Sequence, residues 1–194
     1  MSTNAHTHTI IAHVEDKPGV LNRIASLFRR RGFNITSLTV GRTAEPGVSR
    51  LTLMVDANDD TARRIEAELY KLVNVLLVED VTHAPSVARE LALIKVRATA
   101  DTRSRVLQIC EVFGARVVDL TPQLVTVEFT ATHDKIDDLI GVLSAEGVVE
   151  MVRTGVVAMA RGDRPAFSDS RVTTLSSSSS DSVSHDSHES QGAA

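Results

Sequence analysis

The sequence has few of the residues that point to redox, thiolate-metal or nucleic-acid sites. Of 194 residues, one is cysteine, none is tryptophan, and aromatic residues make up 3%. The single thiol, Cys110, excludes internal disulfides and multi-thiolate metal sites, and it suits a reducing compartment. A net charge of -4 with so few aromatic rings argues against a nucleic-acid binder, which needs a basic surface and stacking platforms.

Long apolar runs are also missing. No stretch approaches the roughly 20 residues that span a bilayer. The opening residues, MSTNAHTHTIIAHV, have neither a basic amphipathic leader nor the apolar centre of a signal peptide. Hydrophobic residues still make up 42% of the chain, enough for one or two cores. We therefore expect a globular, cytoplasmic protein.

The first half of the chain predicts the order strand, helix, strand, strand, helix, strand. Alternation favours a strand in HTHTIIAHV, and helical spacing of apolar residues favours a helix in VLNRIASLFRRR. Pro18 lies close to the start of that helix and Gly32 just past its end. Two strands, NITSLTV and SRLTLMV, then flank a turn at GRTAEPG, and a second helix and the strand VNVLLVEDV follow.

The second half repeats this order. An offset of 82 residues places FGARVVDLT under RGFNITSLT, with Gly114 on Gly32. Beyond a shorter hairpin, TPQL, we align the second helix with an offset of 71, which places Ile136 on Ile65. The two halves are therefore predicted to share one fold.

We assign the fold as α+β, with two tandem ferredoxin-like (βαββαβ) domains at residues 8–83 and 88–162. In each domain both helices pack on one face of a four-stranded antiparallel sheet. The other face in the first half still carries apolar residues, so we expect a partner sheet from the other half or another chain. These residues are Ile11, Leu38, Val40 and either Leu51 or Met54. Residues 163–194, rich in serine, are predicted to be a disordered tail.

The stretch DKPG, from Asp16 to Gly19, forms a corner before the first helix, and Asn34 opens the strand after it. About 13 helical residues separate the two ends by roughly 20 Å. One small ligand cannot bridge that distance within a single chain. Two copies with antiparallel helices would instead create two equivalent sites, each using the corner of one chain and Asn34 of the other.

The residue types in these two places suit an amino acid. Free backbone N–H groups at the helix start bind a carboxylate, and Gly19 permits close approach. Asp16 can receive an ammonium group, Asn34 can pair with either group, and Leu21 or Ile35 can line an aliphatic pocket. The alternative is that Pro-Gly is a common start signal for a helix and binds no ligand.

Several motifs in order resemble a known family. DKPGVL between a strand and a helix resembles the ACT domain, which binds amino acids in allosteric proteins. LFRRRGFNITSLTVGRT, LYKLVNVLLVEDVT, FGARVVDLTPQLVTVEFT and GVVAMARG are similar to the small regulatory subunit of acetolactate synthase, also called acetohydroxyacid synthase. The resemblance covers residues 8 to about 162.

This resemblance implies a non-catalytic subunit that activates a large catalytic subunit and confers feedback inhibition by valine in branched-chain amino-acid biosynthesis. Valine would lie between two ACT domains of a homodimer. Thiamine diphosphate, Mg and FAD are expected on the catalytic subunit, and no cofactor on this chain. The implied effector contacts are Asp16, Gly19, Val20 and Leu21 of one copy and Asn34 and Ile35 of the other.

Two features depart from the simple pattern. The family often has Asn at the position of Asp16, and the added charge puts the effector and its affinity in question. The second half has Ala98, Ala100 and Asp101 where the first has its corner, so we expect no amino acid there. The resemblance implies instead that this half contacts the large subunit through the hairpin Thr121, Pro122, Gln123 and Leu124 and through TGVVAMARG. A plain turn and terminal strand is the alternative.

No pair of acids, activated nucleophile or glycine-rich nucleotide loop is present, so we expect no enzyme activity. His6 and His8 have the spacing of a metal clip, but no further ligand stands near them in sequence, and we expect no metal site. Other functions remain open. They are an ACT-type amino-acid sensor for a different enzyme or for transcription, and a ferredoxin-like metal or RNA module.

Overall fold

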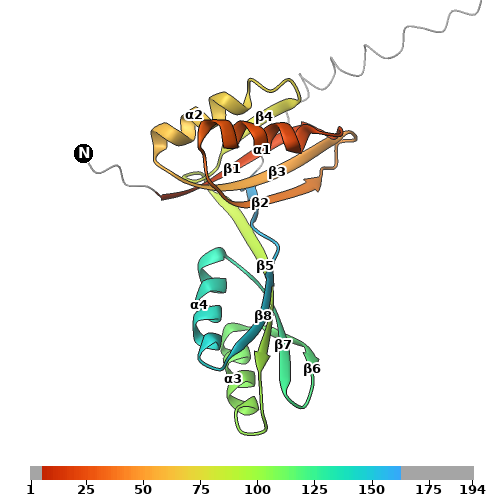
Figure 1. Ribbon diagram of the computed structural model, residues 1–194, viewed down its shortest axis with the longest axis vertical. Helices are drawn as coiled ribbons and strands as arrows, with labels where there is room; N and C mark the ends of the chain where they lie inside the picture. Colours follow the sequence, from red (N-terminus) through yellow and green to blue (C-terminus); the bar gives the residue numbers. More distant parts are fainter. Residues whose placement is uncertain (1–5, 163–194) are drawn as a thin grey trace, which may run out of the picture. The chain divides into compact units, whose positions relative to one another are not determined.

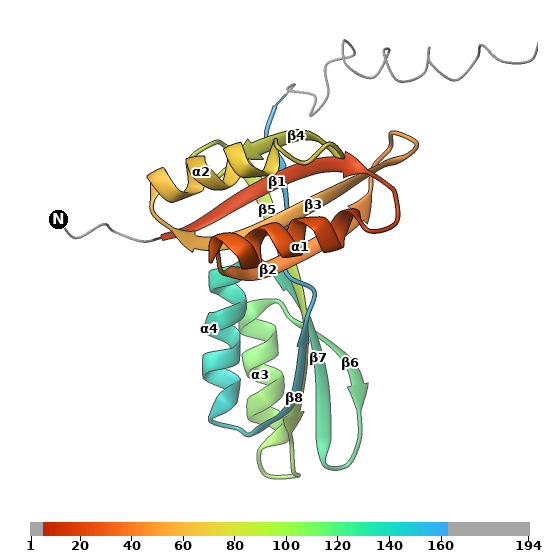
Figure 2. The same cartoon turned by 45° about the horizontal axis from the view of Figure 1, so that its top comes forward.

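The computed structural model describes residues 6–162, and the predicted serine-rich tail lies outside them. In the first half the elements are β1 (His6–Glu15), α1 (Val20–Arg31), β2 (Ile35–Arg42), β3 (Val48–Ala57), α2 (Asp59–Leu69) and β4 (Val75–Asp80). The strands form an antiparallel sheet in the order β2-β3-β1-β4, and both helices cover one face of it (Figure 2). The predicted ferredoxin-like order is confirmed.

The core of this half lies between the helices and the sheet. Alternate residues of β1, including Ile10, Ala12 and Val14, point to this side, as expected from period-two alternation. Ile24 and Phe28 of α1 pack against them, and Ile65 and Leu69 do so from α2. Burial of these side chains is the main force that holds both helices on the sheet.

Glycines fix both ends of α1. Gly19 before the helix has a φ of 84° and Gly32 after it has a φ of 70°, both in the left-handed region that other residues avoid. At the end, the N–H of Phe33 donates to the carbonyl of Phe28 at 3.0 Å, which satisfies a carbonyl of the last turn. The position of this helix was predicted correctly because its signals, the flanking residues and the apolar spacing, lie within the helix or next to it.

A β-bulge at Thr36 corrects one prediction about the faces of the sheet. Ile35 pairs with Val55 and Ser37 pairs with Met54, so the register shifts by one residue between them. After the shift Leu38 lies opposite Leu53 and joins the helix-side core. Val40 shares that side because it lies opposite Leu51. Leu38 and Val40 were therefore assigned to the wrong face.

The other face of the first sheet is covered by a later part of the same chain. Ile11 and Met54 form a buried cluster with Val81, Val156 and Ala158. The N–H of Val156 also donates to Ser37 Oγ at 3.4 Å. The expected cover for this face is thus supplied, at least in part, by residues 156–158.

The second half comprises β5 (Ser86–Arg97), α3 (Arg103–Phe113), β6 (Arg116–Leu120), β7 (Leu124–Ala131), α4 (His133–Ser144), β8 (Val148–Arg153) and β9 (Val157–Ala160). The strand order β6-β7-β5-β8 repeats that of the first half, and β9 pairs with the first residues of β5. Figure 1 shows α3 and α4 beside the strands of this half. Cys110 of α3 is 2% exposed and belongs to the core between the helices and this sheet.

The repeat is confirmed, but one offset is wrong. Gly114 ends α3 with a φ of 70°, matching Gly32 of α1. In α4 the buried residues are Ile136, Leu139 and Leu143, whereas in α2 they are Ala62, Ile65 and Leu69. Both sets align at an offset of 74 rather than 71. A shift of three residues is almost one helical turn, so the sequence pattern alone did not separate the two.

No helix within residues 6–162 has the length and apolarity required to cross a bilayer.

Candidate functional site

The corner before α1 is held by backbone bonds to neighbouring segments. The N–H of Asp16 donates to the carbonyl of Gly47 at 2.7 Å, which joins the corner to the turn between β2 and β3. Arg42, at the end of β2, places its Nε 3.7 Å from Asp16 Oδ2. The Asp16 side chain remains about half exposed, so this pair is weak and solvent-screened. The corner therefore lies at the far end of β2, next to Arg42.

The first turn of α1 is open to an anion. No side chain caps this end of the helix, and no acidic residue occupies its first turn. The leading N–H groups of a helix have no acceptor within it and carry partial positive charge, which favours a carboxylate. A Cβ added to Gly19 would have no atom within 4 Å beyond the adjoining residues, so the glycine is required by its positive φ rather than by close packing.

The two residues after Gly19 have different surroundings. Val20 is 6% exposed and its side chain belongs to the core, and its backbone N–H donates to the carbonyl of Lys17 at 3.4 Å. Leu21 is 45% exposed and presents apolar surface beside the corner. Of the two side chains proposed as contacts, Leu21 is the one in a position to touch an effector.

A part-buried polar network connects the corner to neighbouring segments. Arg23 of α1 donates to Asn74 Oδ1 at 2.7 Å, and the Asn74 amide donates to Glu15 Oε2 at 2.5 Å. The hydrogen bond from Asn74, with a further one from Lys17, holds the pKa of Glu15 below its usual value. The ionised Glu15 thus connects the end of β1 to α1 and to the loop before β4.

Asn34 and Ile35 lie at the opposite end of α1 from Gly19. The 12 residues of α1 span about 18 Å, and Figure 2 shows the helix running along the sheet between these two ends. Asn34 is exposed, and Ile35 packs partly against the core. The structure thus brings Asp16, Gly19 and Leu21 together and keeps Asn34 and Ile35 apart from them, as the distance argument predicted for one chain.

Sequence reasoning missed Arg42 as a neighbour of the corner. Arg42 is 26 residues after Asp16 in the sequence, and only the pairing of β2 with β3 brings it to the corner. It also missed that β2 is an edge strand of the sheet. Val40 on this edge is 46% exposed. An edge with free main-chain groups and apolar side chains is suited to pairing with another strand.

The equivalent corner of the second half is built differently. Arg103, the first residue of α3, donates from Nη2 to the carbonyls of Ala98, Thr121 and Pro122. These bonds tie the hairpin Thr121–Leu124 to the start of the helix. Thr121 and Leu124 also bond to each other through the backbone at 2.9 Å, and residues 121–123 are exposed. The predicted contact hairpin is therefore a fixed, exposed turn.

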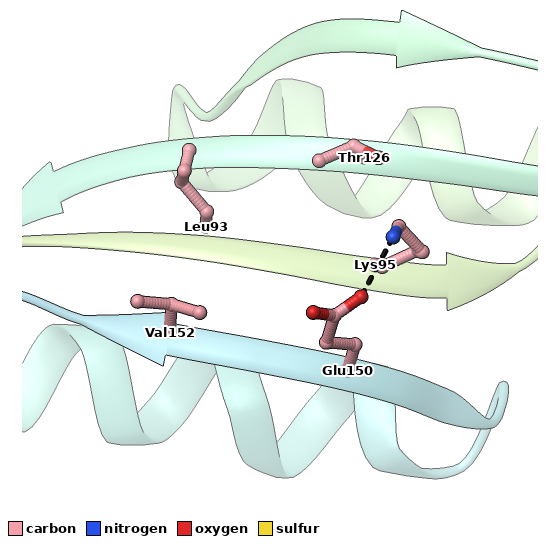
Figure 3. Close-up of a pocket in the computed structure, with 5 residues that line it drawn as sticks. All are labelled: Leu93, Lys95, Thr126, Glu150 and Val152. Atoms are coloured by element: carbon pink, nitrogen blue, oxygen red, sulfur yellow. Dashed lines mark hydrogen bonds and ion pairs between the residues drawn. The ribbon is translucent and has the colours of Figure 1, made fainter.

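The face of the second sheet opposite its helices carries a shallow pocket with mixed chemistry (Figure 3). Lys95 Nζ and Glu150 Oε2 form an ion pair at 2.7 Å across β5 and β8. Leu93 and Val152, which are 39% and 58% exposed, lie beside it, and Thr126 lines the pocket from β7. The open face of this sheet thus presents an ion pair beside exposed apolar side chains.

Both halves of the chain match models of known protein families. Residues 10–77 match the family model "AHAS small subunit-like ACT domain", and residues 89–162 match "Small subunit of acetolactate synthase". The acetolactate synthase small subunit of Mycolicibacterium smegmatis is 46% identical over 164 residues, which cover 84% of this chain and 96% of the relative. This chain belongs to the acetolactate synthase small-subunit family.

Small subunits from other organisms are similar to this chain over nearly their whole length. A probable acetolactate synthase small subunit of Methanothermobacter thermautotrophicus is 44% identical over 81% of this chain and 95% of the relative. The crystal structure of the small subunit from Thermotoga maritima superposes with a TM-score of 0.75 at 40% identity, covering 82% of this chain and 99% of that one. Both ferredoxin-like halves are thus features of the family, and a small subunit implies a catalytic large subunit as its partner.

Proposed function

We propose that this small subunit activates the large subunit of acetolactate synthase and makes it sensitive to an amino-acid effector, valine, held between two copies of the first half. The observation that carries the proposal is the placement of the two half-sites. Gly19 and Asn34 lie at opposite ends of α1, and an antiparallel neighbour brings the missing half to each of them.

The edge strand β2 offers a way to form this pair. The corner lies at the Arg42 end of β2, because of the bonds of Asp16 to Gly47 and Arg42, and Asn34 directly precedes its other end. Antiparallel pairing of β2 with its counterpart across a two-fold axis places the start of one strand beside the end of the other. Asn34 of one copy then faces Asp16 and Gly19 of the other, and Val40 becomes covered.

The chemistry of the shared site follows from the groups present. The open first turn of α1 accepts the effector carboxylate, and Asp16 or Asn34 receives its ammonium group. Leu21 of one copy and Ile35 of the other supply apolar contact for an aliphatic side chain. Arg42 reduces the repulsion between Asp16 and the effector carboxylate because it offsets part of the Asp16 charge.

We propose that the second half contacts the large subunit through the hairpin Thr121, Pro122, Gln123 and Leu124 and the adjoining open face of its sheet. The hairpin is exposed and is held in place by Arg103, so little ordering entropy opposes its binding. Leu93 and Val152 provide apolar contact area on the same sheet.

In the assembled synthase, thiamine diphosphate, Mg and FAD belong to the large subunit, which joins two 2-oxo acids. We place this assembly in the cytoplasm. The chain described here acts by binding and has a regulatory rather than a catalytic role. If the effector lowers the affinity of the small subunit for the large subunit, linkage requires a reciprocal effect. Binding of the large subunit then lowers the affinity for the effector by the same factor.

The test is to mix the purified full chain with a large subunit and to assay acetolactate with and without valine. We expect activation by the small subunit and a fall in rate when valine is added. Gly19→Asp places a carboxylate at the open helix end and should abolish the valine response while activation persists. Leu124→Asp should weaken activation while valine still raises the melting temperature of the isolated chain.

Matched measurements keep the outcomes interpretable. Gly141→Ala, on an exposed position of α4, adds a methyl group that would have no atom within 4 Å beyond the adjoining residues and the backbone of its own helix, and it should leave both responses unchanged. No activation of the large subunit by the wild-type chain would refute the regulatory role. Equal valine affinity for a Val40→Lys variant that is monomeric by sedimentation would refute the shared site.

A further inference from the structure

A cluster of imidazole and carboxylate groups lies at the start of β1, at the opposite end of this strand from the corner before α1. His6 and His8 are two apart on the strand and point to the helix side of the sheet. Asp59 is the first residue of α2, and His83 follows β4. The chain thus brings together residues from three segments that are far apart in sequence.

The distances within the cluster match a metal site. Asp59 Oδ1 lies 3.4 Å from His6 Nε2, 3.5 Å from His8 Nε2 and 3.7 Å from His83 Nε2. The ligand atoms of His6, His8 and Asp59 all lie within 4.8 Å of one another. Around a tetrahedral zinc ion with bonds of about 2.1 Å, neighbouring ligand atoms are about 3.4 Å apart.

His8 supplies an independent sign that a cation belongs here. It is 1% exposed, and its Nε2 is buried without a hydrogen-bond partner. Its Nδ1 lies 2.8 Å from Asp80 Oδ2, and because an ionised carboxylate only accepts, Nδ1 carries the proton. In the neutral ring Nε2 then carries a lone pair and lies 3.5 Å from Asp59 Oδ1, so two electron-donating atoms are close enough to share one cation.

Asp80 has the role that a supporting residue plays in zinc sites. A histidine ligand usually donates its second ring N–H to a carboxylate, which fixes the ring and increases its basicity. Asp80 is itself held by Thr82, whose backbone N–H donates to Asp80 Oδ1 at 2.9 Å. The ring of His8 is thus fixed before any metal arrives.

We propose that His6, His8 and Asp59 bind a divalent transition-metal ion, with zinc as the favoured ion because two imidazoles and a carboxylate are among its preferred ligands. The fourth position is taken by water or by His83, whose side chain is 72% exposed and whose Nε2 lies 3.7 Å from Asp59 Oδ1. A bound ion joins the start of β1 to the start of α2 and to the segment after β4.

This proposal revises the expectation of no metal site. The sequence displayed only the pair His6 and His8, while Asp59 comes 51 residues after His8. Sequence spacing therefore carried no sign of the third ligand. The competing explanation is that a proton, rather than a metal, lies between His8 and Asp59, and it predicts no metal uptake.

The experiment uses the full chain without a histidine tag, stripped with a chelator and then equilibrated with zinc. We expect one equivalent of zinc by elemental analysis, a rise in melting temperature on zinc addition, and tetrahedral ligand-field absorption when cobalt(II) replaces zinc. His6→Ala and Asp59→Asn should each lower zinc affinity at least tenfold. Asp80→Asn should lower it by about 10- to 100-fold through the supporting contact.

Controls separate this site from other sources of binding. Asp60→Asn removes an adjacent acid that pairs with Arg63 and should bind zinc normally. A double variant, His185→Ser with His188→Ser, should also bind normally. Melting of each metal-free variant checks that it is folded. No zinc uptake by the wild-type chain, unchanged affinity in both His6→Ala and Asp59→Asn, or loss of uptake in the double variant would each overturn the proposal. None of these outcomes depends on valine or on the large subunit.

Discussion

Glu90 on β5 is a buried acid whose removal should have a large and pH-dependent effect. It is 4% exposed, and Arg153 donates to it twice, from Nε to Oε1 at 2.9 Å and from Nη2 to Oε2 at 2.6 Å. His133 Nδ1 lies 2.9 Å from Oε2. Burial raises the pKa of Glu90, but the hydrogen bonds from Arg153 and His133 outweigh this and hold it below the usual 4.5.

Glu90→Gln keeps the shape of the side chain and removes its charge. Breaking one partner of a buried ion pair costs about 3–5 kcal/mol, because the other charge remains in a poorly solvated place. Arg153 retains Asp137, whose Oδ1 lies 2.6 Å from Nη1, so part of its charge stays compensated. We therefore expect Glu90→Gln to lower the free energy of unfolding by about 3 kcal/mol at pH 7, the lower limit of that range.

The pH dependence has a definite sign. Because the folded-state pKa of Glu90 is lowered, its contribution is fully present above the unfolded value near 4.5 and is lost as the pH falls through the folded value. The difference between wild type and Glu90→Gln should thus shrink below about pH 4.5. Urea unfolding followed by circular dichroism measures it, and hydrogen exchange in β5 and α4 localises it.

Glu150→Gln is the matched control, since Glu150 is also paired with a cation but is well exposed. Its effect on stability should be much smaller than that of Glu90→Gln. An equal loss for Glu90→Gln at pH 7 and pH 3, or a loss no greater than that of the control, would show that the Glu90 charge is not what stabilises this region.

Two further predictions concern the first half and its cover. Gly155→Ala should expose the N–H of Val156 to hydrogen exchange and lower the free energy of unfolding by about 1–2 kcal/mol. The reason is that Gly155 has a φ of 80° and that a Cβ added there would lie 2.5 Å from Ser37 Oγ. Gly41→Ala is the control, and equal exchange of the Val156 N–H in the two variants would contradict this contact. Burial, aided by the charge of Arg50, lowers the pKa of His13 to about 4. In an NMR titration the ring signals of His13 should therefore stay those of the neutral form down to about pH 5. A titration midpoint near pH 6.5 would refute this prediction.

Much of the fold was predictable because its signals are local or repeated. Apolar spacing and the glycines at positions 19 and 32 defined α1, and the same pattern 82 residues later defined α3. The corner and Asn34 were recognised as separated half-sites from helix length alone. Their role as an effector site remains a prediction. The bulge at Thr36 was not predictable, because one extra residue in a strand leaves no mark in an alternating apolar sequence.

By itself, the sequence determined the order of strands and helices, the duplication and the family, because each rests on neighbouring residues and on motifs in a fixed order. Only the tertiary structure decided which distant side chains meet. It placed Arg42 beside Asp16, enclosed Glu90 between Arg153 and His133, and brought Asp59 to His6 and His8. The physical reason is that strand pairing and burial act between segments far apart in the chain, where residue spacing carries no record of distance.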